Sequence, residues 1–225
     1  MYYKNMRYYF YENSESICND ILNRMLNALP PSRKAEADKL KTPESKRLCI
    51  LAYYLYMFAL MKEKGLTGVG FIKDARGKPV IPGFDFHMSL SHCKAGIACV
   101  ISDFPIGIDV EEISRITLAI AGKICCREEL ALLEKANDKR EFLCKAWVLK
   151  EAYSKLTGNG FSEGFSEINT LARAGDKFFY AKKNDGAGNS ESPLRTPPLY
   201  VGIASEIPLT EEPVEVKVGL ADLVS

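Results

Sequence analysis

The sequence predicts an α+β protein made of two similar halves, each of which combines a long helix with short strands. The first half has a helix signal at residues 43–64 and the second has one at about 139–156. Strand-like pieces lie at residues 68–72, 86–90, 97–102, 106–111, 177–181, 200–205 and 214–218. The order of elements repeats, although the sequence itself does not. We therefore predict a pseudo-dimer of two α+β halves, residues 1–104 and 105–225, with the active site between them.

The first long helix is framed by clear end signals. Residues 42–44 (Thr-Pro-Glu) offer a hydroxyl cap, a proline at the first helical position and an early acid, and Gly65 follows the last turn. Its apolar run, Leu48–Met61, is shorter than the ~20 residues of a membrane span, so we expect a buried helix and no membrane partner. Residues 1–16 alternate like an edge strand, and residues 182–198 have the composition of a mobile surface loop.

The amino-acid composition limits which partners the protein is expected to bind and in which cellular compartment it is expected to work. The chain carries 30 Lys and Arg against 29 Asp and Glu, so it has no overall field that would attract nucleic acid or an anionic membrane. Its seven cysteines form no C-x-x-C pair, and the N-terminus has no secretion-signal pattern. We expect reduced thiols in a cytoplasmic protein.

Two acids interrupt an otherwise apolar, β-branched strand, FPIGIDVEEI at residues 104–113. Side chains two apart on a strand share a face, so Asp109 and Glu111 point the same way. Neighbouring carboxylates repel each other and are costly to desolvate, which favours a cation beside them. A solvated strand rim is the ordinary alternative.

A third acid comes from the second long helix. Trp147, Glu151 and Lys155 recur every four residues and form a stripe beside the apolar face. Glu151 and Lys155 alone could be a surface ion pair worth ~0.3–0.5 kcal/mol. Together with the two strand acids, Glu151 would complete a set of hard oxygen ligands that suits Mg²⁺ and stays open to water and substrate phosphates.

A Mg²⁺ site with few protein ligands usually completes its shell with phosphate oxygens, so phosphate-binding residues should lie nearby. Several short stretches offer hydroxyl, imidazole or cationic side chains. The candidates are Lys155, Ser91, His92, Lys78 beside Pro79, Arg47, Arg33 and Lys34. Each has an ordinary alternative as a solvated cation or a structural side chain, and spacing alone does not bring them together.

In their order along the chain and in their amino-acid residues, these segments resemble the motifs of the Sfp-type 4′-phosphopantetheinyl transferases. The shared motifs are Gly77-Lys78-Pro79, Ser91-His92, Gly107-Ile108-Asp109-Val110-Glu111, Trp147-Val148-Leu149-Lys150-Glu151-Ala152-Tyr153-Ser154-Lys155 and Gly158-Asn159-Gly160. They lie within residues 42–161, about half of the chain. Ser89, Cys93 and Asn159 depart from the residues that are usual at their positions in that family.

The resemblance implies a cytosolic, monomeric enzyme that binds coenzyme A in the cleft between its halves. By this similarity Asp109, Glu111 and Glu151 hold Mg²⁺ together with the coenzyme A pyrophosphate, which Lys155 neutralises. The residues implied at the nucleotide end, including its 3′-phosphate, are Arg47, Lys78, Pro79, Ser91 and His92.

The implied reaction moves phosphopantetheine from coenzyme A to a serine of an apo carrier protein and releases adenosine 3′,5′-bisphosphate. Asp109, Glu151 and Lys155 are the expected catalytic residues. Glu151 is the first choice as general base, with Glu129 or a Mg²⁺-bound water as the alternative. The carrier is expected to dock through exposed apolar residues in the variable loop after Gly122.

Two other functions would use the same features. A Mg²⁺-dependent hydrolase of nucleotide pyrophosphates would use the same acids and Lys155, but with water as the acceptor. A non-catalytic protein that binds coenzyme A or a carrier would keep the fold, yet it would have no need to hold three acids together.

Overall fold

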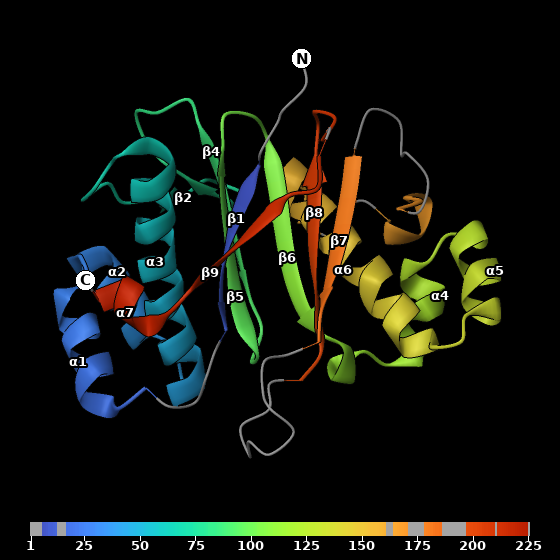
Figure 1. Cartoon of the computed structure of the whole chain (residues 1–225), viewed down its shortest axis with the longest axis horizontal. Coiled ribbons are helices and arrows are strands. Elements are labelled where there is room, and N and C mark those ends of the chain that lie inside the picture. Colours follow the sequence, from blue (N-terminus) through green and yellow to red (C-terminus); the bar gives the residue numbers. More distant parts are fainter. Residues whose placement is uncertain are drawn as a thin grey trace.

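The structure is a computed structural model that describes residues 6–12, 17–160, 164–170, 178–185, 197–209 and 211–224 (Figure 1). The α-helices are α1 (Asn19–Ala28), α2 (Pro31–Asp38), α3 (Pro43–Lys64), α4 (Ala121–Ile124), α5 (Arg127–Lys135), α6 (Lys139–Thr157) and α7 (Leu220–Val224). The strands are β1 (Arg7–Glu12), β2 (Ile72–Lys73), β3 (Pro79–Val80), β4 (His87–His92), β5 (Gly96–Ser102), β6 (Ile106–Glu112), β7 (Phe178–Asn184), β8 (Leu199–Ser205) and β9 (Val214–Val218). Short 3-10 turns occur at Ile113–Arg115, Leu118–Ile120 and Phe165–Glu167.

The first half is a four-stranded sheet in the order β4-β5-β1-β9, with α3 packed on one face. The predicted ends of α3 are confirmed, because the Thr42 hydroxyl accepts the backbone N–H of Ser45 at 3.1 Å and Gly65 has a φ of 67°. Alternation along β1 sends Tyr9 to the core under α3 and Tyr8 to the opposite face. The chain between α3 and β4 forms a separate two-stranded hairpin, β2-β3, which supplies part of the site.

The second half is a three-stranded sheet in the order β6-β8-β7, with α6 packed across it. Two glycines allow the helix backbone to lie directly on the strands. A Cβ atom on Gly107 of β6 would lie 1.9 Å from the carbonyl oxygen of Ala152, and one on Gly202 of β8 would lie 2.7 Å from that of Val148. Only glycine fits at such distances, so these positions fix how closely α6 approaches β6 and β8.

The two halves repeat one topology, which confirms the predicted α+β class. In each half the first strand pairs antiparallel with the third, and the third pairs antiparallel with the second, giving β1-β5-β4 and β6-β8-β7. The long helix follows the first strand in both cases, α3 after β1 and α6 after β6. The division at residues 104 and 105 stays a prediction, and β9 and α7 cross it, because β9 pairs with β1 and α7 contacts α3.

The strands form the centre of the molecule, and the helices lie outside, with α3 on one side and α6 on the other (Figure 1). The two sheets share an apolar core that includes Phe10 of β1 and Ile106, Ile108 and Val110 of β6. Because neighbouring strand residues face opposite ways, the intervening Asp109 points away from this core, toward α6. The same alternation places Glu111 on the α6 side.

Two expectations about the strands need correction. β1 is an interior strand and not an edge strand, since β9 covers its other side. β7 continues to Asn184, into the segment predicted to be a loop, and residues 186–196 of that segment lie outside the described residues. The sequence patterns also give no prediction of α1 and α2. None of the described helices has the length and apolar content needed to cross a lipid bilayer.

Candidate active site

Two adjoining cavities meet at Lys155, His92 and Leu90, which line both of them. The larger, with a volume of about 540 Å³, is lined by α2, α3, the segment around β2 and β3, β4 and the end of α6. The smaller, of about 280 Å³, is lined by β4, β6 and α6. We call them the cationic cavity and the acidic cavity, after the side chains described below.

The acidic cavity brings the three predicted acids together. Asp109 and Glu111 extend from the α6-facing side of β6, and Glu151 extends from α6. Trp147 and Lys155, which belong to the same stripe of α6 as Glu151, line the cavity as well. The helical spacing that marks the stripe and the strand alternation that pairs the acids therefore converge on one site.

Asp109 is the most strongly held of the three acids. Its Oδ1 atom accepts a hydrogen bond from the Ser91 hydroxyl at 2.7 Å and forms an ion pair with the Lys155 ammonium at 2.7 Å. The Asp109 side chain is 9% exposed and that of Lys155 is 31% exposed. Lys155 therefore bridges the acid cluster and the solvent-accessible part of the site.

Among the described residues, Glu111 and Glu151 have no ion pair as short as that between Lys155 and Asp109, and their pKa values are raised. Burial, together with the charges of Asp109 and Glu111, raises the pKa of Glu151 to about 7, although Lys155 opposes the shift. Burial also raises the pKa of Glu111, against the backbone N–H of Glu112 at 3.0 Å and Arg115 at 3.7 Å. The cavity thus holds more negative charge than Lys155 alone offsets.

The donor set suits Mg²⁺ bound through one or two carboxylates. In this conformation the described residues contain no group of three or more His, Cys, Asp or Glu side chains that could hold a metal ion by themselves. Mg²⁺ seldom needs such a group, because it keeps several waters and takes phosphate oxygens as ligands. Burial and the neighbouring Asp109 charge raise the pKa values of Glu111 and Glu151, so the three acids around this open cavity have the charge that such an ion would neutralise.

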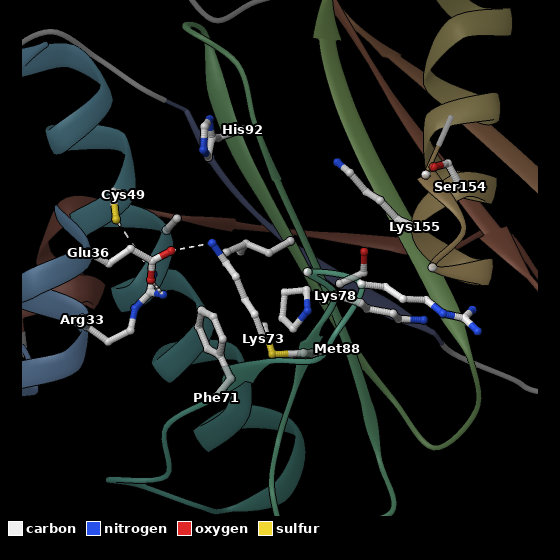
Figure 2. Close-up of a pocket in the computed structure, with 18 of the residues that line it drawn as sticks. Arg33, Glu36, Cys49, Phe71, Lys73, Lys78, Met88, His92, Ser154 and Lys155 are labelled. Carbon is white, nitrogen blue, oxygen red and sulfur yellow. Dashed lines mark hydrogen bonds and ion pairs between the residues drawn. The ribbon is translucent and has the colours of Figure 1, made fainter. Parts of the chain in front are cut away.

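The cationic cavity has five basic side chains in its wall. They are Arg33, Lys73, Arg76, Lys78 and Lys155. Arg33, Lys73, Lys78 and Lys155 are labelled in Figure 2. Phe71 and Met88 contribute apolar surface, and Glu36 is the one carboxylate among the described residues that line it. Its volume and its charge suit an elongated, polyanionic ligand with a flat apolar part.

The turn before Pro79 is anchored to the end of α6 in the other half. Asp74 accepts the backbone N–H groups of Arg76 and Lys78 at 2.9 Å, which closes the turn. From this turn the Lys78 ammonium donates to the Leu156 carbonyl at 2.7 Å, and Arg76 donates to the Asn159 side chain at 2.9 Å. Burial lowers the pKa of Lys78. These contacts hold two cations at the α6 side of the cationic cavity.

Most of the predicted binding residues lie in the two walls, and one does not. Lys78, Pro79 and His92 line the cationic cavity, and Ser91 and His92 line the acidic one. Arg47 is not among the described residues that line either cavity. On α3 it lies about 200° around the helix from Ser45, which does line the cationic cavity, so Arg47 faces elsewhere.

Glu129, the alternative base, is also placed away from the site. Its fully buried carboxylate pairs with the fully buried ammonium of Lys150 at 2.8 Å and accepts the backbone N–H of Thr170 at 2.9 Å. Lys150 in turn donates to the carbonyl oxygens of Phe165 and Ile168. Glu129 and Lys150 therefore tie α5 and the segment after residue 164 to α6, and Glu129 does not line either cavity among the described residues.

Sequence reasoning missed several wall residues. The sequence offered Arg33 and its neighbour Lys34 as candidate phosphate-binding residues without choosing between them. It did not single out Glu36, Lys73 or Arg76. A signal existed for Arg76, which directly precedes the Gly-Lys-Pro turn. Lys73 and Glu36 carry no local motif, and only the packing of β2 against α2 reveals them.

An α+β chain with a lysine and three acids at the junction of a cationic cavity fits a class of enzymes that act on a metal-bound polyphosphate. Residues 105–192 match the sequence profile of the 4′-phosphopantetheinyl transferase superfamily. That match contains Asp109, Glu111, Glu151 and Lys155. Over those residues, which are less than half of its length, the chain is similar to this superfamily, and its curated relatives include proteins named 4′-phosphopantetheinyl transferase psf-1 and 4′-phosphopantetheinyl transferase Sfp.

Two relatives and one solved structure illustrate the similarity. The chain is 37% identical over 115 residues to 4′-phosphopantetheinyl transferase psf-1 of Bacillus pumilus, which covers 50% of this chain and 48% of that protein. It is 26% identical over 183 residues to 4′-phosphopantetheinyl transferase Sfp of Bacillus subtilis strain 168, with coverage of 79% and 77%. A crystal structure of Thermotoga maritima holo-[acyl-carrier-protein] synthase is 24% identical, with a TM-score of 0.33 and coverage of 47% of this chain and 64% of that chain. The match thus spans about half the length of psf-1 and over three quarters of Sfp.

Proposed function

We propose that this chain transfers the 4′-phosphopantetheine group from coenzyme A to a serine of an apo carrier protein, with Mg²⁺, and releases adenosine 3′,5′-bisphosphate. One observation carries the proposal. Asp109, Glu111, Glu151 and Lys155 line an acidic cavity that adjoins a cationic cavity of about 540 Å³. That pairing suits a nucleotide whose pyrophosphate lies at the junction. The names of the relatives support the same reaction.

In this reaction the chain mainly positions its substrates and offsets their charge. Lys78 and Arg76, which contact the end of α6, would bind the nucleotide-side phosphates. Lys155 would bind the pyrophosphate after its ammonium separates from Asp109. Asp109, Glu111 and Glu151 are the residues that would hold Mg²⁺. The bound ion would polarise the pyrophosphate oxygens and neutralise their charge.

Glu151 is the best-placed group to accept the serine proton. With a pKa of about 7, it is a carboxylate in part of the molecules at neutral pH, and its conjugate acid is weak enough to make it a useful base. The serine oxygen forms a bond to the phosphorus that carries pantetheine, and the bond from that phosphorus to the bridging oxygen breaks. The electron pair of that bond leaves with adenosine 3′,5′-bisphosphate, and the serine proton goes to Glu151.

Partner and compartment follow from surface and composition. Exposed apolar residues for a carrier protein were expected after Gly122, where Leu132 of α5 is 47% exposed, and Leu118, just before Gly122, is 50% exposed. All seven cysteines are free, which supports a reducing compartment and hence the cytoplasm. We propose a cytoplasmic monomer with neither nucleic acid nor membrane as partner, in line with a formal net charge of +1.

Intact mass spectrometry of apo carrier proteins tests the proposal. A panel of acyl, peptidyl and aryl carriers is incubated with the protein, coenzyme A and Mg²⁺, with EDTA and Asp109→Ala as controls. The proposal expects one phosphopantetheine group on one or more carriers, and none in either control. Mg²⁺-dependent transfer by Asp109→Ala at the normal rate would overturn the assignment of the site.

The same experiment separates the two rival functions. Cleavage of coenzyme A with no change in any carrier would identify a pyrophosphate hydrolase. Bound but intact coenzyme A would identify a binding protein. Of the two, the hydrolase is favoured by the raised pKa of Glu151, which would serve equally to activate water.

A further inference from the structure

Glu36 is unusual in the cationic cavity because it is the one acid among the described residues that line a wall with five basic side chains. It lies on α2, at the side of the cavity opposite Lys155 (Figure 2). A carboxylate in such a place opposes the binding of an anion, so its contacts decide what this side of the cavity can accept.

Glu36 pairs with two cations at once and offsets one of their two positive charges. Its Oε2 atom is paired with the Arg33 guanidinium, and its Oε1 atom is paired with the Lys73 ammonium (Figure 2). Arg33 is on α2, whereas Lys73 is on β2, so the carboxylate also links two separate elements of the wall. The Glu36 side chain is 36% exposed, which leaves it within reach of a ligand.

Arg76 and Lys78, the cations at the α6 side of the cavity, have different hydrogen-bond acceptors. Arg76 and Lys78 donate to the Asn159 side chain and the Leu156 carbonyl, which carry no formal charge. The carboxylates of Asp74 and Glu206 act on Lys78 from nearby, but Asp74 accepts backbone N–H groups of the turn and is not paired with the ammonium. A phosphate at the α6 side therefore meets cations that donate directly to uncharged acceptors, whereas one at the α2 side meets cations that are already paired with the Glu36 carboxylate.

Contacts other than the ion pair with Glu36 hold the Arg33 side chain in position. It is 8% exposed, lies 4.5 Å over the Phe71 ring and 5.5 Å over the Tyr53 ring, and donates to the Cys49 sulfur at 3.8 Å. Its buried Nε atom has no hydrogen-bond partner in the described structure. Arg33 is therefore fixed by packing and still has an unused donor, as expected where a second acceptor can bind.

We propose that Glu36 is a specificity-determining residue that occupies the anion position at the α2 side and must be displaced by the 3′-phosphate of coenzyme A. This inference rests on the proposed function. With the pyrophosphate at Lys155, the nucleotide extends into the cationic cavity, and Arg33 and Lys73 are the cations at its opposite side. Because displacing Glu36 offsets most of what the 3′-phosphate gains, the chain accepts 3′-dephospho-coenzyme A nearly as well as coenzyme A.

Calorimetric titration of the full chain with both ligands, in Mg²⁺, tests this inference. The unsubstituted protein is expected to bind the two within about threefold of each other. Glu36→Gln is expected to bind coenzyme A about tenfold more tightly and 3′-dephospho-coenzyme A within about twofold of before, because only the 3′-phosphate meets the two released cations. Glu134→Gln, at an exposed position on α5, is the matched control and should change neither affinity.

A second variant, Lys73→Met, tests the inference independently in case Glu36→Gln does not fold. Lys73→Met removes one exposed cation and leaves Glu36 paired with Arg33, so it should weaken coenzyme A and spare the dephospho form. Equal effects of Glu36→Gln on both ligands, or weaker binding of coenzyme A, would overturn the inference while leaving the transferase proposal intact. Failure of both ligands to bind the unsubstituted protein would overturn the proposed function and the inference together.

Discussion

Replacement of Glu151 by glutamine is expected to stabilise the fold while it abolishes activity. Burial and the charges of Asp109 and Glu111 raise the pKa of Glu151 from 4.5 to about 7. A folded state that binds a proton more tightly than the unfolded chain loses stability as the pH rises between those two values. Above about pH 7 the carboxylate is ionised in both states and its full cost to the fold is present, whereas glutamine carries no such cost.

The magnitude follows from the same two pKa values. A shift from 4.5 to about 7 corresponds to at most about 3.4 kcal/mol of differential stability. Because the Glu151 side chain is partly exposed, solvent screening reduces this figure, and we expect roughly 1.5 kcal/mol. The advantage of the glutamine variant should be close to zero near pH 4.5, increase up to about pH 7 and stay constant above it.

Urea unfolding of both proteins at several pH values between about 4.5 and 8 measures this difference. Glu134→Gln, an exposed glutamate on α5, serves as the control and should show no such pH-dependent gain. Saturating Mg²⁺ should stabilise the unsubstituted protein more than the glutamine variant, since the variant lacks one of the three acids. A gain that does not change with pH, or a loss of stability near pH 8, would refute this reasoning.

Three further substitutions test the packing and the site. Lys150→Met should cost roughly 3–5 kcal/mol in urea unfolding because it leaves Glu129 buried without its partner, and adding Glu129→Gln should recover part of that loss; an effect below about 1 kcal/mol would contradict the buried pair. Gly107→Ala should cost more than about 3 kcal/mol, because a Cβ there collides with the α6 backbone, whereas Gly122→Ala, where the space is open, should cost almost nothing in thermal unfolding. Lys155→Met should change the free energy of unfolding by less than about 1 kcal/mol and reduce the transfer rate at least about 100-fold, and the reverse pattern would favour a purely structural ion pair.

The parts of the fold that local rules govern could be predicted from the sequence. The hydroxyl cap at Thr42 and the left-handed Gly65 define α3 almost to the residue, because both act within one helical turn. Strand alternation placed Asp109 and Glu111 on one face, and helical spacing placed Glu151 and Lys155 on one stripe. The convergence of the two faces needed only that α6 lie on β6.

The parts that depend on distant pairing could not be predicted. β9 looks like a strand of the second half, yet it pairs with β1, and no periodicity encodes a partner so far away in the chain. The same holds for the cationic cavity, whose wall takes Lys73 from β2 and Arg33 from α2. Arg47 occupies a motif position on α3 but is not among the described residues that line either cavity, and its binding role stays a prediction, because a motif position does not say which way the side chain faces.

The most direct test of the account measures both products of one reaction. Carrier protein modified with phosphopantetheine is quantified by intact mass, and adenosine 3′,5′-bisphosphate is quantified by chromatography, after incubation with coenzyme A and Mg²⁺. Transfer at the junction of the two cavities predicts one nucleotide released for each carrier modified, and neither product from Glu151→Gln or Asp109→Ala. Release of nucleotide that is independent of the carrier, or modification that survives in both variants, would contradict the account.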